Sequence, residues 1–225
     1  MIQLSRYPIG KGADMDEASF SMAEEFRTKM NVFDALDRLM QAASFDRITV
    51  KQICDEAHVS RATFYRHFND KFAIPQWHLN YAYSRGASEI GCTLPWREGY
   101  YITEAIIAER RNFYSNVAKS DDYNAIDNYA PRLRKRTITS TLVECHHKPL
   151  TERLKFQIDA TVELEVHLLP KWHYGAYDAT LEELCTWLAD SIPRELFFLL
   201  NTPIRPLASG FNAIPPQQKH GSTCH

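Results

Sequence analysis

The stretch that most constrains how this chain can fold is ITVKQICDEAHVSRATFYRHFNDK, residues 48–71. It opens with Thr49-Val-Lys-Gln52, a capping box in which the Thr and Gln side chains satisfy backbone N–H groups at a helix start. Apolar residues then recur along one stripe, so we expect a helix over 49–57. The residues AHVS join this helix to a second short one.

The second helix has one apolar and one polar face. Ser60 is a candidate N-cap, and Phe64 and Phe68 are four residues apart, so both turn toward the preceding helices. Apolar residues on both sides of the turn predict a rigid pair, as a helix-turn-helix needs if its second helix is to project into a DNA groove. The side chains left on the outward surface are Arg61, Ala62, Thr63, Tyr65, Arg66 and His67.

These outward residues have the chemistry of a DNA-binding surface. Arg can hydrogen-bond guanine through two N–H groups, Thr offers a hydroxyl and a methyl, and Ala allows close approach to a thymine methyl. Tyr, His and Lys suit phosphate oxygens, and Lys71 lies where Asn69 or Asp70 caps a fourth helix. Residues 47–71 hold five Lys or Arg against three Asp or Glu, in a chain of formal net charge −2. A positive patch on an acidic body indicates that one end of the molecule meets a polyanion.

The same stretch, with its A-x-V-S-x-x-T-F-Y-x-H-F-x-x-K string, resembles the DNA-binding domain of the TetR-like (tetracycline-repressor-like) transcription regulators over roughly residues 22–75. The resemblance implies an all-α homodimer with an N-terminal three-helix DNA-binding domain and a larger C-terminal helical domain that dimerises and holds a small effector. It implies a repressor that leaves a palindromic double-stranded operator when the effector binds. An activator that works through a partner protein is the alternative.

By position, the resemblance also implies roles for individual residues. Phosphate contacts are implied for Thr49, Tyr65 and Lys71. The other positions implied to face DNA are Lys51, Ser60, Arg61, Ala62, Thr63 and His67.

One position departs from the family pattern. His58 occupies the turn position that the family usually gives to Gly, where the backbone is left-handed. His tolerates this conformation better than most residues, so the fold is expected to hold with some strain. We therefore expect Gly at this position to stabilise the isolated domain by up to about 1 kcal/mol.

Capping boxes, glycines and prolines divide the rest of the chain. The Ser21-Met-Ala-Glu24 box and the apolar spacing after it predict a first helix over about 21–43. We expect a joint between Gly86 and Gly99 and no β-strand. The expected domains are a flexible arm (1–20), the helix-turn-helix domain (21–75), a helical dimerisation and effector domain (76–202) and a disordered tail (203–225). Within the helical domain we expect helices over about 99–119, 122–147, 151–173 and 181–200, with boundaries or kinks at Pro131, Pro149, Pro170 and Pro193.

Two features of the larger domain suggest how it works. Leu181, Leu184, Leu188 and Ile192 form an apolar seam, which predicts dimerisation through this helix and the one over 151–173. Aromatic residues with polar tips are typical of small-molecule pockets between helices. The expected pocket residues are Trp96, Tyr100, Tyr101, Phe113, Tyr114, Tyr129, Phe156 and Trp172.

The composition argues against a secreted or membrane protein and against a disulfide-rich or zinc-binding one. With 44% apolar residues the 225-residue chain can bury a core, and no apolar run has signal-peptide or membrane-spanning length, so we expect a soluble cytoplasmic protein. The five Cys are odd in number, scattered and never spaced as C-x-x-C, so neither a disulfide framework nor a zinc ribbon is expected. Cys145, His146 and His147 are consecutive and point about 100° apart on a helix, so we expect no metal there.

Other functional interpretations have weaker support. The tail holds His220, Cys224 and His225, where no fixed metal site is expected, and the basic run 132–136 is better explained as a solvated helix face than as a second nucleic-acid patch. An enzyme using Cys145 and His146 as nucleophile and base lacks any motif with a third orienting residue. We therefore expect no catalytic residues and no cofactor.

Overall fold

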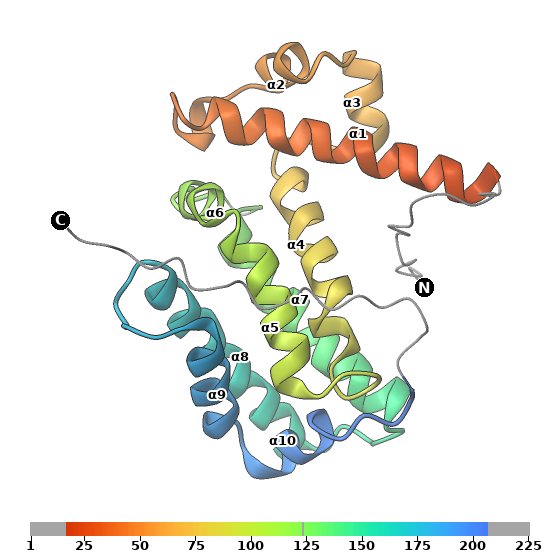
Figure 1. The fold of residues 1–225 in the computed structure, drawn as a ribbon, viewed down its shortest axis with the longest axis vertical. Coiled ribbons are helices and arrows are strands. Elements are labelled where there is room, and N and C mark those ends of the chain that lie inside the picture. Colours follow the sequence, from red (N-terminus) through yellow and green to blue (C-terminus); the bar gives the residue numbers. More distant parts are fainter. Residues whose placement is uncertain (1–16, 123, 207–225) are drawn as a thin grey trace.

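The computed structural model describes residues 17–122 and 124–206, and there it contains helices and no β-strand beyond one bridge between Ile90 and Leu94 (Figure 1). The predicted all-α class is confirmed. None of the helices in this part of the chain is long and apolar enough to cross a membrane. The α-helices are α1 (Glu17–Leu39), α2 (Val50–Ala57), α3 (Arg61–His67), α4 (Ala73–Arg85), α5 (Trp96–Ala108), α6 (Arg111–Val117), α7 (Ile126–Ser140), α8 (Glu152–His173), α9 (Leu181–Ser191) and α10 (Arg194–Leu200). Three short turns complete the set: the 3-10 turns η1 (Phe45–Arg47) and η2 (Ala87–Glu89) and the π-helical turn η3 (Thr141–Cys145).

The first three helices form a unit that we call the head (α1, η1, α2 and α3). In Figure 1 α1 crosses beneath α2 and α3, and α4 leads from the head into the remaining helices, α4 to α10, which we call the body. Phe33 and Leu36 of α1, Ile53 of α2 and Phe64 of α3 are fully buried in the head. Burial of such side chains contributes roughly 1.5–3 kcal/mol each, so α1 and the two short helices α2 and α3 can hold one rigid shape.

The first helix begins earlier than its sequence suggested. We expected Ser21 and Glu24 to cap its start, but α1 begins at Glu17 and passes through both residues. It also ends at Leu39, before the expected residue 43. Ser and Glu cost little inside an exposed helix, so the same letters fit a cap and an ordinary helical turn.

The body follows the expected helices with two differences. The predicted helix 99–119 is divided into α5 and α6, because the chain bends at Arg110, whose guanidinium lies 3.0 Å from Asp34 and 3.3 Å from Asp37 of α1. The predicted helix 122–147 starts at Ile126 and changes to the π-helical turn η3 after Ser140. Within the body, α4 packs on α5 and α7, α7 packs on α8, and α5 packs on α9.

The apolar seam of α9 lies inside one subunit. Leu184, Leu188 and Ile192 are 3%, 2% and 7% exposed, and α9 packs against α5. The prediction that this seam needs a second subunit to cover it is therefore wrong. A helical stripe shows only that a helix has a buried side, and here the partner is α5 of the same chain.

Cys92 and Cys145 form a disulfide across 53 positions of sequence, with their Cα atoms 5.8 Å apart. The scattered Cys residues were not expected to form a disulfide framework, and their spacing gave no sign of this single bond, which forms because the fold brings the end of η3 beside the loop after η2. Ile204 and Arg205 donate backbone hydrogen bonds to the Cys92 carbonyl at 3.1 and 2.8 Å, so the first residues of the expected tail are held here. Cys54 and Cys185 are buried thiols.

Candidate nucleic-acid interface and ligand cavity

The outward face of α3 carries residues predicted to meet DNA. Phe64 is fully buried and Phe68 is 3% exposed, which leaves Arg61, Ala62 and Tyr65 on the exposed side of the helix. Tyr65 is 55% exposed, and its ring lies edge-on to that of Phe64 with centroids 5.4 Å apart. Contact with a buried ring orients Tyr65 although most of its surface is open.

The helix starts of α2 and α3 are capped as predicted. The Thr49 hydroxyl accepts the Gln52 N–H at 3.3 Å, and the Gln52 Oε1 accepts the Thr49 N–H at 2.9 Å. At α3 the Ser60 Oγ accepts the Thr63 N–H at 3.0 Å, and the two hydroxyl oxygens lie 2.9 Å apart. The Thr63 hydroxyl is therefore oriented by Ser60 before any base is present.

The turn between these helices has the left-handed residue that the sequence predicted. His58 adopts φ 54° and ψ 41°, and its N–H donates to the Asp55 carbonyl. The next N–H, of Val59, donates to the Cys54 carbonyl at 3.0 Å. These bonds satisfy carbonyls at the end of α2, so the fold stabilises a conformation that disfavours a side chain.

Lys51 and His67 have different surroundings. The Lys51 Nζ lies 3.1 Å from Asp55 Oδ2, and both side chains are about two-thirds exposed, so Lys51 remains accessible to an anion. His67 is partly buried near α1, and burial lowers the pKa of its imidazole. The Lys29 charge lowers this pKa further and the Glu25 charge opposes it. These surroundings favour the neutral ring.

Lys71 has a role different from the predicted phosphate contact. Its ammonium donates to the carbonyls of Phe45, Asp46 and Ile48 at 3.0, 2.9 and 3.0 Å. It also lies 4.9 Å from the ring centroid of Phe45 and 5.5 Å from that of Phe72. A Lys ammonium has three N–H donors, and all three are used here. Lys71 therefore ties the start of α4 to η1, and burial lowers its pKa.

A second set of contacts joins the head to the body. Phe33 of α1 stacks on His78 of α4 at 4.2 Å between centroids and contacts Phe113 of α6 at 4.3 Å. The His78 Nδ1 lies 2.8 Å from the Tyr114 hydroxyl. Burial lowers the pKa of His78 to about 4, so the imidazole is neutral at neutral pH. This chain of rings runs from the head to Tyr114, which lines a cavity in the body.

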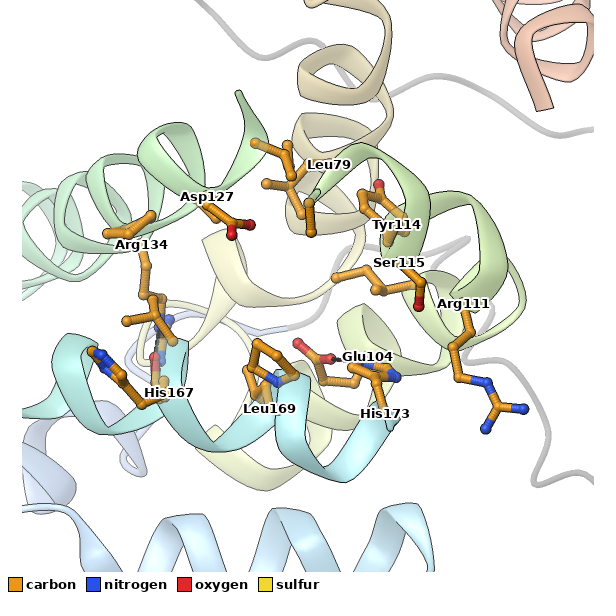
Figure 2. Close-up of a pocket in the computed structure, with 18 of the residues that line it drawn as sticks. Leu79, Glu104, Arg111, Tyr114, Ser115, Asp127, Arg134, His167, Leu169 and His173 are labelled. Carbon is orange, nitrogen blue, oxygen red and sulfur yellow. Dashed lines mark hydrogen bonds and ion pairs between the residues drawn. The ribbon is translucent and has the colours of Figure 1, made fainter. Parts of the chain in front are cut away.

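The cavity has a volume of about 460 Å³ and lies between α4, α5, α6, α7 and α8 (Figure 2). This volume is within the range of small-molecule sites. An ion pair lies in its wall: Arg134 of α7 donates to both oxygens of Glu165 of α8, at 2.6 and 3.0 Å, and both side chains are at most 2% exposed. Burial opposes the charge of Arg134, but the adjacent Glu165 carboxylate outweighs it, and the Arg134 pKa is raised.

Two further carboxylates line the cavity, Glu104 as a buried side chain and Asp127 as an exposed one. The Glu104 side chain of α5 is 4% exposed, and its Oε2 lies 3.3 Å from the His173 Nε2 of α8. Figure 2 shows Asp127 of α7 pointing into the space from the opposite side, and burial raises its pKa. The cavity thus combines an internally neutralised ion pair with additional acidic groups.

Six of the eight aromatic residues expected in a pocket do not line this cavity. Tyr100 and Tyr114 do line it, and Trp96 stacks behind Tyr100 at 4.3 Å between centroids. Phe156 is 74% exposed on α8, so its assignment to a buried pocket is wrong. Tyr101, Phe113, Tyr129 and Trp172 pack elsewhere in the core: Tyr129 accepts a hydrogen bond from Asn80, and Trp172 donates one to the Ala179 carbonyl.

Sequence reasoning missed the charged lining residues. Arg134 stands in the run RLRKR, which we interpreted as a solvated helix face, and nothing local separates it from its exposed neighbours Arg132 and Lys135. Glu104 stands alone among apolar residues on α5, which is a weak signal of burial, but Glu165 lies between Glu163 and His167 and gives no such signal. Only the fold shows that these residues face one cavity.

The Cys145, His146 and His147 run does not converge on one point. Cys145 is in the disulfide, the His146 Nε2 lies 2.8 Å from the Gly91 carbonyl, and His147 is exposed with φ 53°. Residues 17–122 and 124–206 contain no group of three or more His, Cys, Asp or Glu arranged to hold a metal ion. The tail residues His220, Cys224 and His225 lie outside the described residues.

Comparison with known proteins agrees with this geometry. Residues 32–74, which span most of the head and the start of α4, match the family model of bacterial regulatory proteins, tetR family. The fold is similar to that of a solved protein, the dihydroxyacetone kinase operon activator DhaS, with a TM-score of 0.54 at 15% identity over 78% of this chain and 97% of that one. A TetR transcriptional regulator from Streptococcus agalactiae has a TM-score of 0.47 at 16% identity over 79% of this chain and 100% of that one. No curated protein matches the chain by sequence.

Proposed function

We propose that this TetR-like chain is a sequence-specific DNA-binding transcription regulator, and that it acts as a homodimeric repressor released by a small molecule in the body cavity. The observation that carries the proposal is α3. It begins with a capped turn, buries Phe64 and Phe68, and leaves Arg61, Ala62 and Tyr65 open on one rigid surface. A helix held in this way can enter the major groove, where base edges are distinguishable.

The DNA contacts divide by chemistry. Arg61 and Thr63 lie in the first turn of α3, where side chains of a recognition helix contact bases, so we assign them to base reading. Ala62 allows close approach there. Tyr65, Lys51, His67 and the Thr49 and Ser60 caps are assigned to the DNA backbone, which sets the register without carrying sequence information. Lys71 supports this surface from behind by holding η1.

Dimerisation is assigned to a surface other than the buried α9 seam. Arg153 of α8 and Glu195 of α10 form an ion pair at 3.3 Å, and Phe156 and Phe198 follow them by three residues each. Residues three apart lie on the same side of a helix, so each Phe lies on the side of its helix that carries this ion pair. The two Phe side chains are 74% and 68% exposed. Large exposed aromatic residues of this kind mark a surface that a partner covers.

Coupling between effector and DNA would use the ring contacts at the junction. Tyr114 contacts the cavity and His78, and His78 stacks on Phe33 of the head. A ligand that displaces Tyr114 would therefore change how the head sits on the body. Because such coupling is reciprocal, bound DNA must lower the affinity for the ligand by the same factor by which the ligand lowers the affinity for DNA.

An activator is the second candidate, because the solved protein of similar fold is described as an operon activator. In either case the chain would act on DNA in the cytoplasm and would have no enzymatic role. Transcription in vitro from a promoter carrying the selected operator separates the two, because a repressor lowers the transcript level and an activator raises it.

The test of the proposal is selection of duplexes from a random pool by the purified protein, followed by titration and sedimentation. We expect one palindromic sequence to be enriched and two chains to bind each duplex. Phe156→Glu with Phe198→Glu should give monomers that keep their helical content. Failure to enrich any sequence would exclude a sequence-specific regulator.

A further inference from the structure

More carboxylates than cations line the cavity, and neither of the two lining guanidiniums is available to balance the excess. Its charged lining consists of four carboxylates and two guanidiniums, besides His167 and His173. Arg134 is already paired with Glu165, and Figure 2 shows Arg111 pointing away from the cavity at its edge. Neither guanidinium therefore offsets the remaining carboxylates, which are Glu104, Asp127 and Glu163.

Glu104 is the most deeply buried of these three. Its only partner in the described part of the chain is His173, and the 3.3 Å distance is longer than the 2.6 Å of the shortest Arg134–Glu165 bond. Charge-assisted N–H to carboxylate bonds are typically about 2.7–2.9 Å, so His173 satisfies Glu104 weakly. The second carboxylate oxygen makes no hydrogen bond there. A buried carboxylate with spare acceptor capacity favours a donor, and most of all a cation.

Two hydroxyls add acceptors to the same cavity. Tyr83 is 7% exposed and Tyr100 is 2% exposed, both line the cavity, and neither hydroxyl hydrogen-bonds another described residue. Burial raises the pKa of both, so they stay neutral at physiological pH. The Tyr114 hydroxyl, in contrast, is engaged by His78. Neutral hydroxyl oxygens can accept N–H bonds from a ligand, and Tyr rings attract cations.

Most of the remaining lining, apart from Ser115 and Tyr174, is hydrocarbon. The apolar residues come from all the surrounding helices, which leaves the polar groups few and separate. The apolar lining residues are Leu79, Ile107, Ala118, Ile126, Ala130, Pro131, Val166, Leu169 and Pro170. A ligand that fills about 460 Å³ must therefore carry an apolar portion beside its polar group.

We propose that the cavity binds an amphiphilic organic amine whose ammonium group donates to Glu104, while its hydrocarbon portion lies along the apolar walls. This assignment rests on the proposed function, in which the cavity holds the effector. An organic anion of the same shape would face Glu104 and Asp127 without a free cation, and a neutral analogue would leave the Glu104 charge unbalanced.

The test uses three probes of one shape and three charges: 4-phenylbutylamine, 4-phenylbutanol and 4-phenylbutyrate. At about pH 7 the amine is a cation and the acid an anion, so calorimetric titration of the full chain compares charge at nearly constant size. We expect the amine to bind at least about tenfold more tightly than the alcohol, and the acid to bind most weakly. Equal or tighter binding of the alcohol or the acid overturns the proposal, and so does the absence of binding by all three.

Three variants locate the contact. Glu104→Gln keeps the size of the side chain and removes its charge, so it should abolish the preference for the amine over the alcohol. Glu163→Gln removes an exposed charge at the mouth, where Glu163 lies 3.6 Å from His167, and should change the preference by less than about twofold. His173→Gln removes the competing partner and should leave amine binding equal or tighter. If Glu163→Gln reduces the preference as much as Glu104→Gln does, the preference arises from the overall negative charge of the cavity and not from a specific contact with Glu104.

These titrations contain no DNA, which separates this inference from the proposed function. Duplex binding by the same preparation, without ligand, tests the regulator. A protein that binds its operator but prefers the acid keeps the proposed function and loses this inference. A protein that prefers the amine but binds no duplex does the reverse.

Discussion

The head and the body use charged residues in opposite ways. In the head, Arg61 and Lys51 lie on the surface, and the buried positions are apolar. In the body, Arg134, Glu165 and Glu104 lie inside, around a cavity. A charged residue on a helix therefore need not lie on the surface, because helices of the body turn charged side chains toward an enclosed cavity.

The buried ion pair should give the largest effect. Glu165→Gln leaves the Arg134 guanidinium buried without its counter-charge, which should cost about 3–5 kcal/mol of unfolding free energy. Asp159→Asn breaks an ion pair between the same two helices, but Lys135 and Asp159 are about half exposed, so the loss should stay below about 1 kcal/mol. Urea unfolding measures both. Equal losses would show that Arg134 is hydrated through the cavity and is not a buried charge.

The disulfide should come next. It closes a loop of 53 positions, so Cys92→Ser with Cys145→Ser should lower the unfolding free energy by about 2–4 kcal/mol. Thiol reductant should produce the same loss in the native protein and no further change in the double variant. Thermal unfolding with and without reductant measures this. A native protein that is insensitive to reductant would mean that the bond is absent in solution.

Lys71, which follows the head and binds η1, tests whether a cation near the DNA-binding surface can be structural. Lys71→Met removes three hydrogen bonds to backbone carbonyls and should destabilise the head by about 1–3 kcal/mol, whereas Lys51→Met should cost less than about 1 kcal/mol. The salt dependence of DNA binding should show the opposite order, with the larger effect for Lys51→Met. Lys51→Met should lower the salt slope by about one ion per subunit, and Lys71→Met should not. A lower salt slope with unchanged stability for Lys71→Met would instead support the predicted contact between Lys71 and a DNA phosphate.

Arg61 tests the outward face of α3. Arg61→Ala should weaken binding to the selected operator by about 1–3 kcal/mol and change binding to scrambled DNA little, because a lost base contact removes discrimination. Thr63→Val keeps the shape and removes the hydroxyl, so it should act at one base position. Titration against both duplexes at two salt concentrations is the measurement. A uniform loss on all DNA would place Arg61 on the phosphate backbone.

His58 should give the smallest effect. His58→Gly relieves the left-handed backbone at φ 54° and should raise the unfolding free energy by up to about 1 kcal/mol. His58→Ala keeps a side chain at this position and serves as the control, with no gain expected. Differential scanning calorimetry compares the three proteins. A lower melting temperature for His58→Gly would mean that the imidazole makes a stabilising contact.

The head could be predicted in detail because its signals are local. The Thr49 and Ser60 caps each involve a residue three positions away, and the His58 turn depends on its own backbone. Lys71 is the exception, since it binds carbonyls 23 to 26 positions earlier in the chain. No spacing rule connects such groups, so its surface position was the natural prediction.

The body could be predicted only as helices. Leu184 and Leu188 were recognised as a buried stripe, but the stripe does not name its partner, which is α5 of the same chain. The Arg134–Glu165 pair spans 31 positions and the disulfide spans 53. Contacts of that range are set by how helices pack, which one sequence does not specify. The cavity therefore became visible only in the assembled fold.

The disulfide has a further consequence for the cavity. Residues 92–145 form one covalent ring, and α5, α6 and α7, three of the five helices around the cavity, lie wholly within it. The other two helices lie outside the ring, because α4 ends before Cys92 and α8 begins after Cys145. A protease that cuts the α6–α7 connection would therefore open the ring without releasing a fragment, and two pieces would separate only after reduction. The walls of the cavity can thus be nicked and still remain one molecule.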